Sequence, residues 1–403
     1  GKTCPWPRLK RGTISLNTAS EAAISTIKGW VEECFDSHEP CQQIRQKPQL
    51  PTRVVEIIDA TTIRLREDCH EKGIYTCLSH CWGKKSFIRT TTASLAAHCD
   101  TISWDDLPTT FQDTIDITRR LGVRYIWIDS LCIIQQDDLE DWRHEGSKMC
   151  DIYSGSYLTI AASRSEDSTG GCYSIADTIQ ETPQWFTNAN NEQYSVNMRL
   201  SIQHELETSP LIQRAWFFQE RVLSPRVVHF GPDELYWECR VGNTCECSDW
   251  RYVEESEYLP TRLGRRFETD KPYPTQSGLW HFVVRQYTRK KLQYETDIFP
   301  ALQGVAKSLQ HYGDYYAGLW RSETLLLDLL WCSWDHSRPA VCRAPSWSWA
   351  SVTGRVYWYN YPQDFELLAE VVSIQTIPLG SDPFGQLLSG QLELKGPCFT
   401  GRI

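Results

Sequence analysis

The expected fold is decided by the stretch Val123-Arg124-Tyr125-Ile126-Trp127-Ile128-Asp129, in which a mostly apolar run ends abruptly in a carboxylate. Such a run is typical of a strand that is buried on both faces, as the strands of parallel sheets are. Similar runs precede and follow it in the chain, at residues 75–81 and 156–162. We therefore expect strands 75–81, 123–129 and 156–162 to be parallel neighbours in one sheet.

Helical patterns alternate with these three runs. In residues 108–121, Phe111, Ile115 and Leu121 recur at helical spacing, and Gly122 provides a natural stop. Residues 138–153 carry a second helical pattern and residues 211–223 a third. The alternation predicts right-handed crossovers between parallel strands. The sequence therefore favours an α/β fold, with helices 108–121 and 138–153 packed on a parallel sheet.

The rest of the chain forms flanking segments around this core. Residues 20–34 have the pattern of an amphipathic helix, and residues 54–58 and 62–65 are two short strand candidates around a turn. We expect four parts, which are an N-terminal helix and strand segment (1–73), the core (74–240), a charged linker or loop (241–280) and a mixed α+β C-terminal region, helical and then β-rich, packed on the core (281–403).

Composition excludes several classes of protein. The chain has 403 residues, a formal net charge of −10 and 16 cysteines. An acidic surface argues against general nucleic-acid binding, which needs a basic stripe. No apolar stretch reaches the length of about 18 residues that a membrane span needs, and the first residues lack a signal-peptide pattern. We therefore expect no membrane partner, a cytoplasmic location and cysteines that are mostly reduced and buried.

A ligand site is expected at one edge of the sheet, since parallel sheets bind ligands outside the carboxyl ends of their strands. After the first strand come Ser79, Trp82 and Gly83, where Trp82 either stacks on a base or covers the core, and Gly83 lets a ligand approach the backbone. Asp129 ends the second strand, as a site residue or as the cap of the following turn. Arg164 follows the third strand, either for phosphates or in a surface salt bridge.

Several blocks of the chain, in order over residues 50–240, resemble the heterokaryon-incompatibility (HET) family of filamentous fungi. The opening block is Tyr75-Thr76-Cys77-Leu78-Ser79-His80-Cys81-Trp82-Gly83, in which His80 replaces a common tyrosine. The central blocks are Leu107-Pro108-Thr109-Thr110-Phe111, Arg124-Tyr125-Ile126-Trp127-Ile128-Asp129-Ser130-Leu131-Cys132-Ile133-Ile134-Gln135 and Leu158-Thr159-Ile160-Ala161-Ala162. The closing block contains Arg214-Ala215-Trp216, Gln219-Glu220-Arg221 and Leu223-Ser224.

This resemblance implies a role in programmed cell death after non-self recognition. The HET family is in turn similar to TIR domains, several of which cleave NAD, so the implied fold is a TIR-like (flavodoxin-like) sheet. TIR domains carry an essential glutamate four residues after a tryptophan, the spacing of Trp216 and Glu220 here. The resemblance thus implies NAD as a substrate rather than a bound cofactor, activation by self-association, and an upstream recognition protein.

Cleavage of NAD breaks the bond between ribose and nicotinamide, and its transition state resembles an oxocarbenium ion. One carboxylate near the ribose can orient hydroxyls and offset the developing positive charge. Glu220 is our choice for it, with an ion pair to a neighbouring arginine or a solvent-facing position as the alternative. Glu145 is the second choice, with a structural ion pair as its alternative. Arg214 could contact phosphates, and Trp216 shares the helical face of Glu220.

The sequence does not predict a metal site, although one group of residues has suitable spacing. The spacing Cys34-x3-His38-x2-Cys41 suits three zinc ligands, but the sequence shows no clear fourth, although Cys4, Cys69 and His70 are candidates. The pair Cys245-x-Cys247 is a weaker signal. We predict no zinc at Cys34, His38 and Cys41.

Three functions remain open from the sequence. The first is an NAD glycohydrolase controlled by self-association. The second is a non-catalytic module that recruits death-signalling partners through a Trp-rich surface. The third is a HET-fold protein adapted to small-molecule biosynthesis, with an apolar pocket.

Overall fold

The computed structural model describes residues 14–42, 48–135, 139–176, 184–196, 208–247, 276–334, 337–359 and 366–398. Its contacts divide the chain into two compact units. The first contains residues 1–138, 155–212 and 224–264, and the second contains residues 139–154, 213–223 and 265–403.

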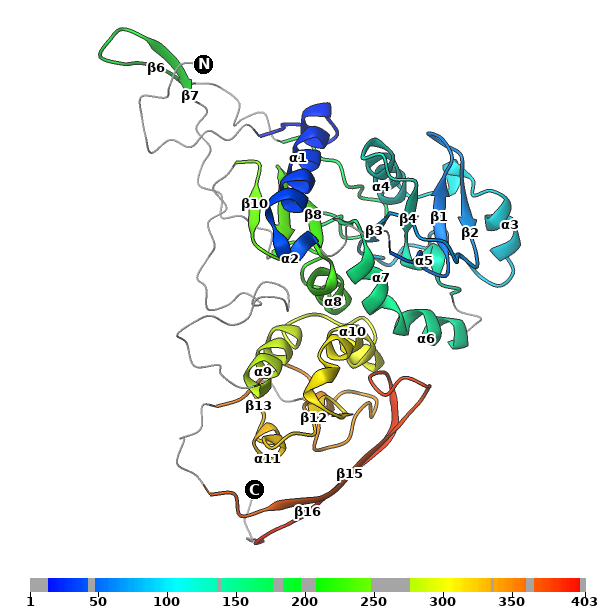
Figure 1. Ribbon diagram of the computed structural model, residues 1–403, viewed down its shortest axis with the longest axis vertical. Coiled ribbons are helices and arrows are strands. Elements are labelled where there is room, and N and C mark those ends of the chain that lie inside the picture. The colour runs from blue at the N-terminus through cyan, green and yellow to red at the C-terminus, as the bar shows by residue number, and fades with distance from the viewer. Residues whose placement is uncertain are drawn as a thin grey trace. The chain divides into compact units, whose positions relative to one another are not determined.

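The first unit is built around one mixed sheet, which has eight strands among the residues described, in the order β10-β9-β8-β5-β3-β4-β1-β2 (Figure 1). The strands are β1 (Val54–Ile57), β2 (Ile63–Arg66), β3 (Tyr75–Ser79), β4 (Tyr125–Trp127), β5 (Leu158–Ala161), β8 (Arg226–Phe230), β9 (Leu235–Cys239) and β10 (Asn243–Cys245). A separate hairpin of this unit joins β6 (Gln184–Thr187) to β7 (Gln193–Val196).

The centre of the sheet is parallel. Strand β3 pairs in parallel with β4 on one side and with β5 on the other, and β5 pairs in parallel with β8. This confirms the prediction that the three apolar runs are parallel neighbours. All five residues of β3 and all four of β5 are buried, as expected for strands covered on both faces.

Antiparallel strands extend both ends of this centre. Strand β1 pairs with β4 and with β2, and the β1–β2 turn is held by Asp59, whose Oδ1 accepts the backbone N–H of Thr61 and of Thr62. At the other end β9 pairs with β8 and β10. The two strand candidates of the N-terminal segment are therefore confirmed, and they belong to the same sheet as the HET-like runs.

The helices of the first unit are α1 (Glu21–Ser37), α2 (Glu39–Gln42), α3 (Leu95–Asp100), α4 (Thr109–Arg120) and α5 (Asp129–Cys132). Helix α1 begins at the side chain of Ser20, whose Oγ accepts the N–H of Ala23, and it buries Ile24, Ile27 and Val31. It lies against the β8–β10 end of the sheet (Figure 1). Helix α4 confirms the predicted helix 108–121.

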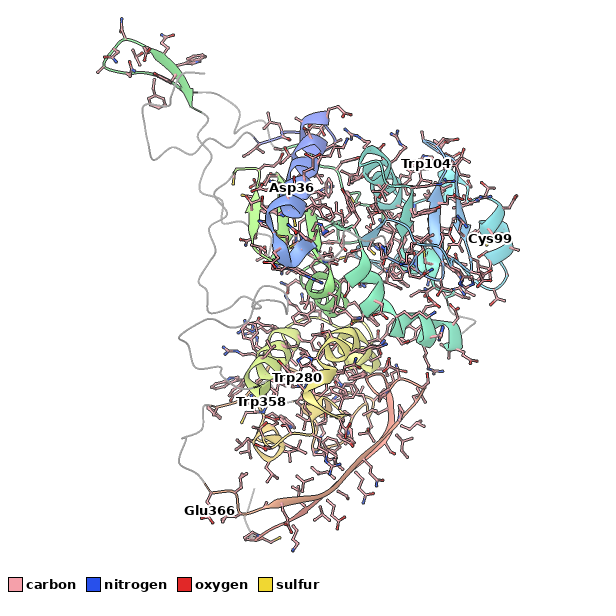
Figure 2. All side chains as sticks on the ribbon, viewed as in Figure 1. Asp36, Cys99, Trp104, Trp280, Trp358 and Glu366 are labelled. Carbon is pink, nitrogen blue, oxygen red and sulfur yellow. The ribbon has the colours of Figure 1, made fainter. Side chains whose placement is uncertain are left out.

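The second unit is mostly helical, with a long terminal hairpin. Its helices are α6 (Leu139–Ser147), α7 (Met149–Gly155), α8 (Ala215–Leu223), α9 (Gln276–Tyr287), α10 (Pro300–Ser308) and α11 (Leu325–Asp328). Its strand pairs are β11 (Tyr315–Tyr316) with β12 (Leu319–Trp320), β13 (Cys332–Ser333) with β14 (Val356–Tyr357), and β15 (Glu370–Pro378) with β16 (Leu387–Lys395). Trp280, labelled in Figure 2, is buried here and donates through Nε1 to the carbonyl of Gly318 at 2.7 Å.

The expectation of one helix over 138–153 is wrong, because α6 ends at Ser147 and α7 starts at Met149. Gly146 and Ser147 are weak helix formers, and the Ser147 hydroxyl donates to the carbonyl of His144 at 2.7 Å. Both helices fall mainly in the second unit rather than in the unit that holds the sheet. The expected linker 241–280 includes strand β10 and the start of helix α9. Residues 248–275 lie outside the described residues.

The fifteen cysteines in the described part of the chain are free thiols, and most are buried. Among the same residues, no helix has both the length and the apolar character needed to cross a membrane.

Candidate functional site

The carboxyl ends of β3 and β4 bring Trp82 and Asp129 together. Strand β3 ends at Ser79, which is buried, and Asp129 opens α5 directly beyond β4. Trp82 Nε1 donates to Asp129 Oδ2 at 2.9 Å. Asp129 Oδ1 accepts the backbone N–H of Ser130 at 2.7 Å, although the N-cap residue of α5 is Ile128.

Aromatic rings, a histidine and an arginine surround this pair. His80 is buried, with Nδ1 4.0 Å from Asp129 Oδ1, and its ring packs edge-on against Phe111. The guanidinium of Arg89 lies 5.7 Å from the centre of the Trp82 ring and 5.4 Å from that of Phe87. Neither His80 nor Arg89 was expected as a site residue from the sequence. His80 could have been found from its place directly after a predicted strand. Arg89 could not, because it lies in a loop that no predicted strand precedes directly.

The backbone of Gly83 lies close to the loop that follows β5. Its φ of 71° lies in the left-handed region that favours glycine, and a Cβ there would stand 2.2 Å from Cβ of Asp167. Asp167 is held by Lys85, with Nζ 3.3 Å from Oδ2, and by Thr169, whose hydroxyl hydrogen bond lowers the pKa of Asp167. The space beside Gly83 is therefore filled by the loop after β5.

Arg164 holds the same loop together. Its Nη1 donates to the carbonyls of Gly170 at 2.9 Å and Tyr173 at 2.8 Å. On the other side of the loop, Asp113 of α4 accepts the backbone N–H groups of Cys172 and Tyr173. These bonds give Arg164 a structural role, which neither requires nor prevents contact with a phosphate.

The remaining predicted residues, Glu220, Trp216, Arg214 and Glu145, belong to the second unit. Glu220 is only 7% exposed, so it does not face solvent. Trp216 donates through Nε1 to Asp297 at 3.0 Å, and burial raises the pKa of Asp297. Arg214 forms a backbone bridge with Lys291. Glu145 is buried and makes the structural ion pair that was its alternative, with Lys148 Nζ 2.8 Å from Oε1.

A shallow pocket of the second unit includes part of this set. Its lining residues are Trp142, Arg143, Gly146, Trp216, Pro300, Gln303 and residues 379–382, 385 and 386. Trp142 and Trp216 meet edge to face there, with ring centres 6.2 Å apart. Neither Glu220 nor Glu145 lines this pocket.

The expectation of no zinc at Cys34, His38 and Cys41 rested on a missing fourth ligand. The structure supplies that side chain, because Cys239 lies with these three residues in one cluster. Of the earlier candidates, Cys69 instead donates to the carbonyl of Arg66, and Cys4 lies outside the described residues. Spacing along the chain could not identify Cys239, which is 201 residues from His38.

Comparison with known proteins agrees with the sequence motifs. Residues 75–220 match the family described as "Heterokaryon incompatibility protein (HET)". No curated protein and no solved structure matches the chain. The matched range runs from the first residue of β3 to Glu220 in α8. A HET domain indicates a function related to heterokaryon incompatibility or cell death, and this chain carries a HET domain over residues 75–220.

Proposed function

We propose that the protein is a cell-death effector that binds NAD at the carboxyl edge of strands β3, β4 and β5 and hydrolyses the nicotinamide–ribose bond. The observation that supports this most strongly is the strand order β4-β3-β5-β8. Numbered along the chain within the parallel part, this order is 2-1-3-4, as in flavodoxin-like sheets, whose ligands bind where the strand order reverses. That reversal lies between β3 and β5, beside the β3–β4 edge where Trp82 and Asp129 meet, and the resemblance to TIR domains makes NAD the ligand to test.

The edge also offers the groups that NAD chemistry needs. The Trp82 ring provides an aromatic face for a base, and Arg89 beside it provides a guanidinium for a phosphate. The Asp129 side chain is 23% exposed, so it can accept hydrogen bonds from ribose hydroxyls. Its negative charge would also offset the positive charge that develops on the ribose in the transition state.

In this reaction the nicotinamide leaves as a neutral base, taking the electron pair of the broken bond. Water forms the new bond to the ribose carbon and releases a proton. No acid is needed for the leaving group, which is cationic before it departs. Asp129 would therefore act by orienting the ribose and by electrostatics, while Glu220 and Glu145 stay predicted catalytic carboxylates that the same experiment tests.

The test is nicotinamide release from NAD by the purified full chain, measured by chromatography for wild type and variants. Asp129→Asn keeps the size of the side chain but removes its charge, so the rate should fall by about 10²–10³-fold. Arg89→Ala should raise KM more than it lowers kcat, because it removes a binding contact. The matched control is Asp167→Asn, a carboxylate already held by Lys85 and Thr169, which should keep the wild-type rate.

Glu220→Gln and Glu145→Gln distinguish the remaining carboxylates. A loss of about 10²–10³-fold in Glu220→Gln, with unchanged thermal stability, would give the catalytic role to Glu220, whereas an unfolded variant would show a structural role. We expect Glu145→Gln to lose less activity. A wild-type protein that neither binds nor cleaves NAD, even when forced to assemble, would refute the proposed function.

A second candidate, the recruitment of death-signalling partners without catalysis, is favoured by the surface of the β15–β16 hairpin. Ile377 is 56% exposed and Leu388 is 64% exposed. Large exposed apolar side chains gathered on one element are typical of a protein-binding surface. Forced assembly of the chain, with NAD loss and cell death measured together, separates this candidate from NAD cleavage.

A further inference from the structure

Three sulfur atoms and one imidazole gather at the carboxyl end of helix α1. They belong to Cys34, His38, Cys41 and Cys239, and one ligand atom from each lies within 4.8 Å of all the others. His38 Nδ1 is 3.3 Å from Cys239 Sγ. A tetrahedral zinc ion with Zn–S bonds of about 2.3 Å spaces its ligand atoms about 3.8 Å apart. Small side-chain adjustments would therefore bring this cluster to zinc geometry.

Local backbone structure positions three of the four side chains. Cys34 lies in the last turn of α1, and the N–H of His38 donates to its carbonyl at 3.3 Å. The N–H of Cys41 in α2 donates in turn to the carbonyl of His38 at 2.8 Å. The corner between α1 and α2, next to the labelled Asp36 in Figure 2, therefore holds these three side chains together.

The fourth side chain comes from the sheet. Cys239 is the last residue of β9, where its N–H donates to the carbonyl of Gly242 in the tight turn to β10. The N–H of Val241 points to Cys239 Sγ at 3.5 Å, which is the kind of outer contact that orients a metal-bound sulfur.

A buried cation next to the cluster is a separate observation that points to a bound metal. Arg226 is fully buried, and it lies directly opposite Cys239 in the β8–β9 pair, so the two side chains emerge on the same face of the sheet. Its guanidinium carbon lies 3.9 Å from the centre of the Phe35 ring. Within the described residues, none of the three guanidinium nitrogens has a hydrogen-bond partner.

Such a guanidinium needs a nearby negative charge. Arginine stays protonated in proteins, and an unpaired buried charge is strongly destabilising. Cys239, which lies opposite Arg226, and the other two cysteines of the cluster are neutral when their thiols are protonated. Three thiolates and one neutral imidazole around Zn²⁺ carry a net charge of −1, which would neutralise Arg226.

We infer that Cys34, His38, Cys41 and Cys239 bind one Zn²⁺ ion as a structural site that fastens α1 and α2 to strand β9. The three cysteines are buried and His38 is half-buried, so four protein ligands fill the coordination shell and leave no open position for catalysis. Binding releases the three thiol protons. This inference is independent of the proposed NAD chemistry.

A second group, Glu234, Cys245 and Cys247, also has its ligand atoms within 4.8 Å of one another. It offers three ligands among the described residues, and Glu234 already accepts the backbone N–H of Cys247 at 2.9 Å. We do not assign a metal to it. It serves instead as an internal control for the location of any bound zinc.

The first experiment measures zinc by mass spectrometry in the full chain, purified under reducing conditions and supplied with Zn²⁺. We expect one zinc per chain, lost in Cys239→Ser and in His38→Ala. The matched control is Cys172→Ser, which removes a buried thiol from the same hydrophobic core, and Cys247→Ser controls for the second group. Both controls should keep the zinc. Wild type without zinc, Cys239→Ser with zinc, or loss of zinc in Cys247→Ser would overturn the inference.

The second experiment remains informative if a ligand variant fails to fold. Co²⁺ bound in place of zinc should give the absorption bands of tetrahedral cobalt with thiolate ligands. His38→Cys retains four ligands, so it should bind Co²⁺ with bands shifted towards those of four thiolates. Arg226→Met should weaken zinc binding by about tenfold or more in competition with a chelator. Octahedral cobalt bands, or a His38→Cys spectrum identical to wild type, would contradict the assignment.

Discussion

Gly83 and Gly122 both have left-handed backbone conformations, yet they differ in the space around them. A Cβ on Gly83 would meet the side chain of Asp167 at 2.2 Å, whereas one on Gly122 would meet no atom within 4 Å. The pair can therefore separate the cost of backbone strain from the cost of a steric clash. This matters for the candidate site, because the contact between Gly83 and Asp167 joins the loops that follow β3 and β5.

Replacing Gly122 by alanine should lower the free energy of unfolding by about 1–2 kcal/mol, the cost of a left-handed alanine. Gly83→Ala should cost about 1–3 kcal/mol more, because the clash adds overpacking strain. Urea unfolding of the two variants beside wild type measures both values. Equal losses in the two variants would show that the loop holding Asp167 moves away without cost.

At the scale of a single element, helix α3 contains a buried histidine that makes stability depend on pH. His98 is the buried residue of α3, and its Nδ1 lies 2.9 Å from the Thr90 hydroxyl. Burial lowers the pKa of His98 below its ordinary value of 6.5. The unfolded chain therefore binds a proton more readily than the folded protein. Burial of His98 leaves the free energy of unfolding unchanged above pH 6.5, and it lowers that free energy as the pH falls towards the pKa of the folded state.

The prediction is that wild type loses more unfolding free energy than His98→Asn between about pH 7.5 and pH 5.5. Asparagine can keep a hydrogen bond to Thr90 but does not titrate. Urea midpoints at the two pH values measure the difference between the proteins. Parallel losses in both would show that His98 does not contribute to the acid sensitivity.

Elements were predicted well where local sequence determines them and poorly where tertiary contacts do. The apolar runs gave the three parallel strands, because burial on both faces leaves a continuous apolar signal. The same signal placed strand ends too late, since Asp129 starts helix α5 instead of ending β4. The break at Lys148 was missed because Gly146 and Ser147 only weaken a helical pattern without interrupting it.

At the scale of the whole molecule, activation by assembly remains a prediction carried by the resemblance to TIR domains. Fusing the chain to an inducible oligomerisation domain should increase both NAD loss and cell death. A double variant, Ile377→Lys with Leu388→Lys, removes two exposed apolar side chains of the β15–β16 hairpin and should leave NAD loss unchanged. Death that rises while NAD stays constant, and that depends on these two side chains, would favour the recruitment function.

The sequence could not show which distant segments of the chain meet to form the sites. It placed Trp82 and Asp129 at one sheet edge correctly, because both follow predicted neighbouring strands. It could not pair Cys239 with Cys34, or Arg89 with Trp82, since side chains that meet through tertiary structure leave no periodic pattern. Contacts between residues far apart in the chain require the three-dimensional fold.

The packing of α1 against β9 has a consequence during translation. His38 and Cys239 are neighbours although 201 residues separate them in the chain. At about 5–20 residues per second, a ribosome needs roughly 10–40 s to add that many residues. Throughout this interval the apolar face of α1 and the thiols of Cys34 and Cys41 lack the strand that later covers them. During this interval the nascent chain exposes an apolar helix face, which is the kind of surface that makes incomplete chains prone to aggregation.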